Sequence, residues 1–94
     1  MMDKECDISI IIAVYNHEKY IKQAIDSVLM QKTEYSYEVL IGEDCSTDSS
    51  REVLKSMESN LPPTFHFFYR EHNYGAKRNF EDLYIRMRGK YYIV

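Results

Sequence analysis

Several features that define common protein classes are missing from this 94-residue sequence. Two cysteines are too few for a disulfide scaffold and have no metal-ligand spacing, so we expect a reduced, cytoplasmic protein. The 12 basic residues do not exceed the 15 acidic ones, which argues against a dedicated nucleic-acid binder. The longest apolar run, residues 10–14, is far shorter than the roughly 20 residues of a membrane-spanning helix, and residues 1–5 show no signal segment.

The usual phosphate-binding loops are missing as well. The sequence has no Gly-x-Gly-x-x-Gly and no Gly-x-x-x-x-Gly-Lys-Ser/Thr motif, so a dinucleotide-binding or P-loop protein loses its main support. A bound diphosphate would need a metal ion or basic side chains, for which Lys77 and Arg78 are candidates; an exposed helical turn explains these two residues equally well. The three histidines have no ligand spacing, and no Cys-His signature accompanies Cys45, so we predict neither a metal site nor a catalytic thiol.

The residues that are present are sufficient for one small domain over residues 1–94, because 45% of them are hydrophobic. Apolar, β-branched runs alternate with segments in which apolar residues recur at helical spacing, which predicts alternating strands and helices. Gly89 is predicted to be the C-cap of the last helix. The predicted strands cover residues 8–15, 37–42, 65–69 and 91–94, and the predicted helices cover residues 18–31, 49–59 and 76–87.

This order predicts a Rossmann-like, three-layer α/β/α fold with a mostly parallel sheet and helices on both faces. By the usual strand order, the fourth strand lies next to the first and forms an open edge. In such sheets ligands bind beyond the carboxyl ends of the strands, near the point where the strand order reverses. The residues that follow the first two strands are therefore the candidates for a binding site.

Those residues offer an aromatic ring beside a carboxylate. Tyr15 and Asn16 end the first predicted strand, and Glu43 and Asp44 follow the second. A planar heterocycle with a ring N–H, such as uracil, needs a π-face to stack on and an acceptor for its donor edge. The alternative is that Tyr15 is a core residue at the end of a strand and that the two acids form a solvated turn.

Several segments, taken in order, resemble the opening of family 2 glycosyltransferases. They are ISIIIAVYN at residues 8–16, SVLMQ at 27–31, YEVLIGEDCSTD at 37–48, NYG at 73–75, NF at 79–80 and RGKYY at 88–92. The resemblance covers nearly the whole chain. It implies a GT-A fold and transfer of a sugar from a nucleotide-diphosphate donor, with a divalent cation, Mg or Mn, expected for the complete enzyme.

The resemblance also implies roles for individual residues. Tyr15 matches the aromatic residue that packs on the nucleobase, Asp44 matches an acid that contacts the base, and Glu43 stands where the family more often has Asp. Ala13 lines the same pocket through backbone groups. The predicted nucleotide-binding residues are Ala13, Tyr15, Asn16, Glu43, Asp44, Asn73, Gly75 and Asn79, with no catalytic residue and no metal ligand among them.

In the family, an acidic metal-binding motif and the catalytic base follow the strand that begins at Tyr91, and this sequence ends at Val94. We therefore expect a donor-nucleotide half that is inactive alone, binds a UDP-linked sugar and holds no metal by itself. The complete enzyme would act in the cytoplasm, or at the inner face of the membrane, on a carbohydrate or lipid-linked acceptor such as a cell-surface polysaccharide.

The exposed sheet edge predicts homo-oligomers. The alternative function is a non-catalytic module of the same fold that binds a nucleotide or another protein. A flavodoxin-like signalling receiver is disfavoured, because it would need acids at the ends of two strands and the acids here follow only the second.

Overall fold

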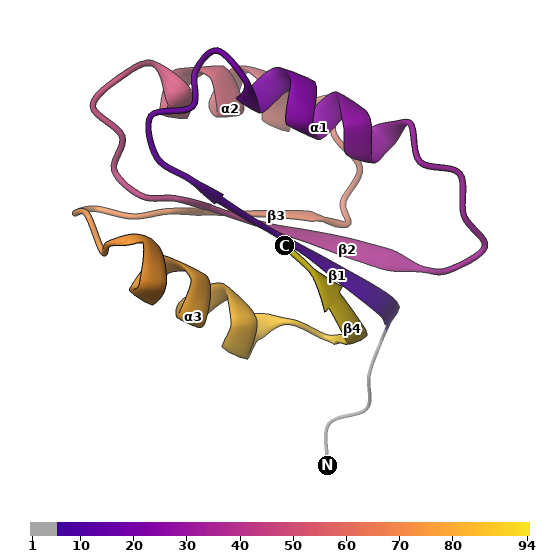
Figure 1. The fold of residues 1–94 in the computed structure, drawn as a ribbon. Coiled ribbons are helices and arrows are strands. Elements are labelled where there is room, and N and C mark those ends of the chain that lie inside the picture. Colours follow the sequence, from indigo (N-terminus) through magenta and orange to yellow (C-terminus); the bar gives the residue numbers. More distant parts are fainter. Residues whose placement is uncertain (1–5) are drawn as a thin grey trace.

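The computed structural model describes residues 6–94 (Figure 1). Residues 1–5, in which the sequence shows no signal segment, lie outside the described residues. Strands and helices alternate along the chain, as the sequence predicts. They are β1 (Cys6–Val14), α1 (Ile21–Leu29), β2 (Tyr37–Glu43), α2 (Ser50–Glu58), β3 (Phe65–Tyr69), α3 (Ala76–Arg86) and β4 (Gly89–Ile93).

The four strands form one parallel sheet in the order β3-β2-β1-β4. The chain adds β2 and β3 on one side of β1 and then returns to place β4 on the other side, so the strand order reverses at β1. Val14 and Glu43 are paired in the register of β1 and β2, which brings the carboxyl ends of these two strands to one level. The predicted topology, including β4 beside β1, is therefore confirmed.

The helices cover both faces of the sheet, with α1 and α2 on one face and α3 on the other (Figure 1). Alternate residues of the strands point to opposite faces of the sheet and pack into two separate hydrophobic cores. Ile41 packs with Ile25 of α1 and Leu54 of α2, whereas its neighbour Leu40 packs with Leu83 of α3. This alternation explains why the strands read as nearly continuous apolar runs.

Two predictions about element ends are wrong. The first helix begins at Ile21 and not at residue 18, because the backbone N–H groups of residues 16–18 donate to side chains in the loop after β2 and at the start of α2. Gly89 is the first residue of β4 and not a helix C-cap, since α3 ends at Arg86 and Met87 is already extended. A Cβ on Gly89 would lie 2.5 Å from the backbone nitrogen of Ser9, so the close approach of β4 to β1 requires glycine there.

Tyr20, Leu29 and Tyr84 are exposed, although each recurs at the helical spacing of the apolar residues. Tyr84 instead makes an edge-to-face contact with Tyr92 of β4, with ring centroids 5.3 Å apart. Ser49 is the N-cap but makes no side-chain cap bond, and Asp48 Oδ1 accepts the N–H of Ser50.

Among residues 6–94, no helix has both the length and the apolar character needed to cross a membrane.

Candidate functional site

A cavity of about 260 Å³ lies where β1 and β2 end. Its walls come from the end of β1 and the turn after it, from the residue after β2, and from the turn and first residues of α3. Six of the eight predicted site residues line it: Ala13, Tyr15, Asp44, Asn73, Gly75 and Asn79. The topology thus brings together residues that are up to 66 positions apart in the sequence, as the strand-reversal argument requires (79 minus 13).

Tyr15 stands at the mouth of the cavity, with 43% of its surface exposed. It is the first residue after β1, and Asn16 then takes a left-handed conformation, with φ of 57°. Asn is among the residues that tolerate this conformation best. The turn directs the chain away from the sheet and leaves the tyrosine ring accessible beside the cavity.

Asn16 does not line the cavity; its hydrogen bonds connect the turn after β1 to the loop after β2. Its backbone N–H donates to Ser46 Oγ at 2.9 Å, and its side-chain Oδ1 accepts the N–H groups of Thr47 at 2.9 Å and Asp48 at 3.2 Å. These bonds join the end of β1 to the loop after β2. Asn16 therefore stabilises the turn that carries Tyr15.

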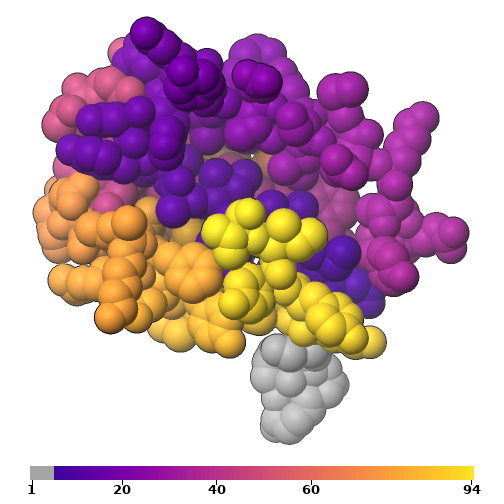
Figure 2. Space-filling view, viewed as in Figure 1, coloured from indigo at the N-terminus to yellow at the C-terminus, as the bar shows by residue number. Residues whose placement is uncertain are grey.

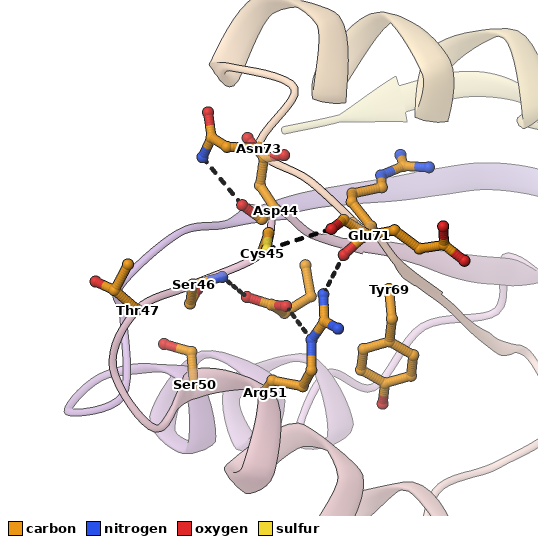
Figure 3. A network of polar contacts seen from close by, with 12 residues as sticks. Asp44, Cys45, Ser46, Thr47, Ser50, Arg51, Tyr69, Glu71 and Asn73 are labelled. Atoms are coloured by element: carbon orange, nitrogen blue, oxygen red, sulfur yellow. Dashed lines mark hydrogen bonds and ion pairs between the residues drawn. The ribbon is translucent and has the colours of Figure 1, made fainter.

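Asp44 is buried in the cavity wall and holds the turn before α3. It is 2% exposed, and its two carboxylate oxygens accept the backbone N–H groups of Tyr74 at 2.6 Å and Gly75 at 3.0 Å. Asn73 Nδ2 donates to the Asp44 carbonyl oxygen at 3.0 Å (Figure 3). A single carboxylate after β2 therefore fixes the turn that leads into α3.

Glu43 is fully buried and faces away from the cavity. Its Oε1 accepts Arg51 Nε at 2.6 Å and its Oε2 accepts the Ser46 N–H at 2.9 Å. Burial opposes ionisation, but the hydrogen bonds from Ser46 and Arg51 outweigh it and lower the pKa of Glu43. Arg51 also donates to the Arg70 carbonyl oxygen, so this ion pair ties α2 to β2 and to the residue after β3.

Asn79 closes the bottom of the cavity but has little capacity left for a ligand. It is 1% exposed; its Nδ2 donates to the Gly42 carbonyl oxygen at 3.0 Å, and its Oδ1 accepts Nε and Nη2 of Arg70. Arg70, also buried, forms an ion pair with Asp82 at 2.7 Å. Arg86 Nε also lies 2.9 Å from the Asp82 carboxylate. The two guanidinium groups outweigh the effect of burial and lower the pKa of Asp82.

The basic residues at the start of α3 differ in their surroundings. Lys77 is exposed, whereas the guanidinium of Arg78 lies 5.3 Å from the centre of the Tyr74 ring. The guanidinium of Arg70 lies 4.8 Å from the centre of that ring. These contacts are cation–π in kind and stabilise the turn that carries Asn73 and Gly75.

A divalent cation does not fit the residues of this site. Within residues 6–94, no three His, Cys, Asp or Glu side chains lie where they could hold a metal ion together. The two acids nearest the cavity are already used, Glu43 by Arg51 and Asp44 by the turn before α3.

Three residues of the cavity wall were not predicted: Val14, His17 and Ala76. Sequence reasoning set His17 aside because it lacks metal-ligand spacing. Its position one residue beyond the Tyr15-Asn16 strand end was the available signal, since every side chain of that turn lies near the site.

A larger groove of about 710 Å³ lies between α1 and the edge of the sheet formed by β1 and β4. Aliphatic side chains such as Ile8, Ile10, Val28 and Ile93 dominate its walls. A nucleotide needs several polar partners, which this groove offers only at its margin. The smaller cavity at the strand ends is therefore the better candidate for a nucleotide.

The sheet order and the two helical layers, with a cavity at the carboxyl ends of β1 and β2, match part of the GT-A fold. A sequence model described as glycosyl transferase family 2 matches residues 9–94. The chain belongs to this family.

Relatives and solved structures agree with this assignment. An uncharacterized protein of Mycobacterium tuberculosis is 36% identical over 84 residues, which are 89% of this chain and 24% of that protein. TuaG of Bacillus subtilis, which has the provisional name of a teichuronic acid biosynthesis glycosyltransferase, is 34% identical over 84 residues, or 89% of this chain and 32% of TuaG. The chain thus spans about a quarter of the length of the first of these curated relatives.

The crystal structure of Staphylococcus aureus TarS 1-349 in complex with UDP-GlcNAc superimposes with a TM-score of 0.77 at 25% identity, over 93% of this chain and 25% of that chain. The mannosyltransferase PcManGT from Pyrobaculum calidifontis, solved with GDP-Man and Mn²⁺, gives a TM-score of 0.73 at 16% identity, over 92% of this chain and 26% of that chain. The second likeness concerns the fold alone.

Proposed function

We propose that this chain is the donor-nucleotide-binding part of a glycosyltransferase, and that the cavity at the ends of β1 and β2 receives the uracil end of a UDP-linked sugar. The observation that carries the proposal is the position of Tyr15 and Asp44 on one small cavity at the reversal of strand order. The structural match to TarS, which was solved with UDP-GlcNAc, supports the choice of uridine.

The volume of the cavity supports a role at the base end of the donor. Ligand pockets usually measure about 300–1,000 Å³, and 260 Å³ is below that range. A planar base fits this volume, whereas a complete sugar nucleotide does not. In this proposal the diphosphate and the sugar extend out of the cavity.

Two interactions would give most of the affinity. A base stacked on the exposed ring of Tyr15 is worth about 1–3 kcal/mol, and a hydrogen bond from the base to the Asp44 carboxylate about 1.5–3 kcal/mol. After the cost of association, these contributions give roughly millimolar binding. Asp44 retains acceptor capacity for this bond because each of its oxygens accepts one backbone N–H and has a further lone pair.

The finer parts of the proposal concern the complete enzyme. It would transfer the sugar to a carbohydrate or lipid-linked acceptor such as a cell-surface polysaccharide, in the cytoplasm, with Mg or Mn at a site outside these residues. The names of TuaG and TarS support an acceptor of this kind. We expect the 94-residue chain to bind nucleotide without releasing UDP from a donor sugar, since Asp44 of the cavity wall holds the turn before α3 and the neighbouring Glu43 is paired with Arg51.

The test is an NMR titration of the chain with UDP, comparing Tyr15→Ala, Tyr15→Phe and Tyr35→Ala. Removing the ring at position 15 should weaken binding at least about fivefold, because even the lower value for stacking is about 1 kcal/mol. Phe keeps the stacking face, and Tyr35 is an exposed tyrosine outside the cavity wall, so both controls should bind like the wild type. Equal affinity of Tyr15→Ala and wild type would remove Tyr15 from the site.

A further inference from the structure

His17 is part of the cavity wall, and its ring is held in one tautomer by the turn after β1. The backbone N–H of Tyr15 donates to His17 Nδ1 at 3.3 Å. A neutral imidazole has one acceptor and one donor nitrogen. Because Nδ1 is the acceptor, the ring proton is on Nε2, and Nε2–H is the hydrogen-bond donor that the ring can offer to a ligand.

The ring is held by the Tyr15 N–H, and the backbone that carries it is fixed by two further hydrogen bonds. The left-handed Asn16 reverses the chain, which allows the side chain of residue 17 to reach back to the N–H of residue 15. The backbone N–H of His17 donates to Ser50 Oγ at 2.7 Å, and its carbonyl oxygen accepts the N–H of Ile21 at 2.9 Å. The donor is therefore already in place before a ligand arrives, which lowers the entropic cost of binding.

The other polar groups of the cavity make such a donor useful. Asp44 and Asn73 present carboxylate and amide oxygens, and the second of these has its amide nitrogen engaged with the Asp44 carbonyl oxygen. A nucleotide carries more acceptor oxygens than donors, on its base carbonyls, its ribose and its phosphates. A cavity with acceptors alone would satisfy few of them.

We propose that His17 is a ligand-binding residue of this site, and that its Nε2–H donates a hydrogen bond to an oxygen of the bound nucleotide. This inference rests on the proposed function, since it assumes that a nucleotide occupies the cavity. It assigns a role to a histidine for which the sequence pattern suggested none.

Two substitutions separate the ligand contact from the contact within the turn. In His17→Asn, the amide oxygen can replace Nδ1 and keep the bond from the Tyr15 N–H, but no group replaces Nε2–H. In His17→Gln, the longer side chain places an amide N–H near the position of Nε2 and loses the Nδ1 contact. A ligand-binding role predicts that Gln retains affinity and Asn does not, whereas a purely structural role predicts the reverse.

The experiment is a chemical-shift titration of each 94-residue variant with UDP and with uridine, with Tyr15→Ala as a further arm. We expect UDP to bind His17→Asn about threefold to tenfold more weakly than wild type, which is the effect of one lost hydrogen bond, and to bind His17→Gln within about twofold of wild type. An equal loss for uridine places the acceptor oxygen on the nucleoside, and a loss confined to UDP places it on the diphosphate.

A second readout does not depend on affinity. Long-range ¹H–¹⁵N spectra of the His17 ring should show the Nε2–H tautomer in the free protein and a change of the Nε2 signal on addition of UDP. Wild-type affinity of His17→Asn, together with an unchanged ring signal, would overturn the inference while leaving Tyr15 binding intact. Failure of UDP to bind the wild-type chain would instead overturn the proposed function.

Discussion

Substitution of Gly42 in β2 tests the packing and the hydrogen bonds that position Asn79 at the cavity. A Cβ at this position would lie 2.3 Å from Asn79 Oδ1 and 3.0 Å from Leu83 Cδ1. Asn79 cannot move away freely, because its amide nitrogen bonds to the Gly42 carbonyl oxygen and its amide oxygen accepts two bonds from the buried Arg70. Gly42→Ala therefore forces a choice between a steric overlap and the loss of a buried, charge-assisted hydrogen-bond pair.

The expected cost is large for a chain of this size. Overpacking a tight interior costs about 1–3 kcal/mol, and a hydrogen bond to a charged group is worth about 1.5–3 kcal/mol. We expect Gly42→Ala to lower the free energy of unfolding by about 3 kcal/mol, against a total of about 5–14 kcal/mol for a domain of this length. A loss of that size lowers the melting temperature by about 12–24 °C.

The assay is urea unfolding followed by circular dichroism, applied to Gly42→Ala, Asn79→Ala and the double variant. Asn79→Ala removes the obstructing side chain, so in that background the methyl group at position 42 should cost less than about 1 kcal/mol. The two single effects should therefore be strongly non-additive. Additivity within about 0.5 kcal/mol, the usual result for independent sites, would refute the account of this contact.

Two further predictions concern acidity and association. Glu43 has a lowered pKa in the folded chain, so the stability it contributes is present above its unfolded pKa of about 4.3 and is lost as the pH falls through its folded pKa. The free energy of unfolding, measured between pH 7 and pH 3, should therefore be clearly lower for Glu43→Gln than for wild type at neutral pH. This difference should shrink below about pH 4, and a difference that stays constant with pH would contradict the prediction. The edge strand β4 exposes Tyr91 and Ile93, and Val94 after it is exposed as well. The C-terminal end of the chain lies on the surface in Figure 2, and we expect the chain to self-associate through this edge. Light scattering after size exclusion should show a mass that rises with protein concentration. Ile93→Lys should restore the mass of a monomer, whereas Met30→Lys, at an exposed apolar position after α1, should not. A wild-type chain that is a monomer at all concentrations would contradict the prediction.

The order of elements and their pairing were determined by the sequence itself. The β-branched runs and the helical spacing of apolar residues are local signals, and the handedness of parallel crossovers leaves few ways to arrange them. For the same reason the meeting of Tyr15 with Asp44 was predictable, because the carboxyl ends of adjacent parallel strands share one edge of the sheet.

Only the tertiary structure decided what each polar residue at that edge does. Glu43 and Asp44 are neighbours in the sequence, yet one is buried against Arg51 and the other lines the cavity, because successive residues of an extended segment point to opposite sides. Asn16 connects two loops through hydrogen-bond partners about 30 positions away. The role of His17 as a donor depends on the left-handed turn at Asn16 and on its bond to Ser50. Such contacts leave no periodic trace in the sequence, and they become visible only when distant segments are placed side by side.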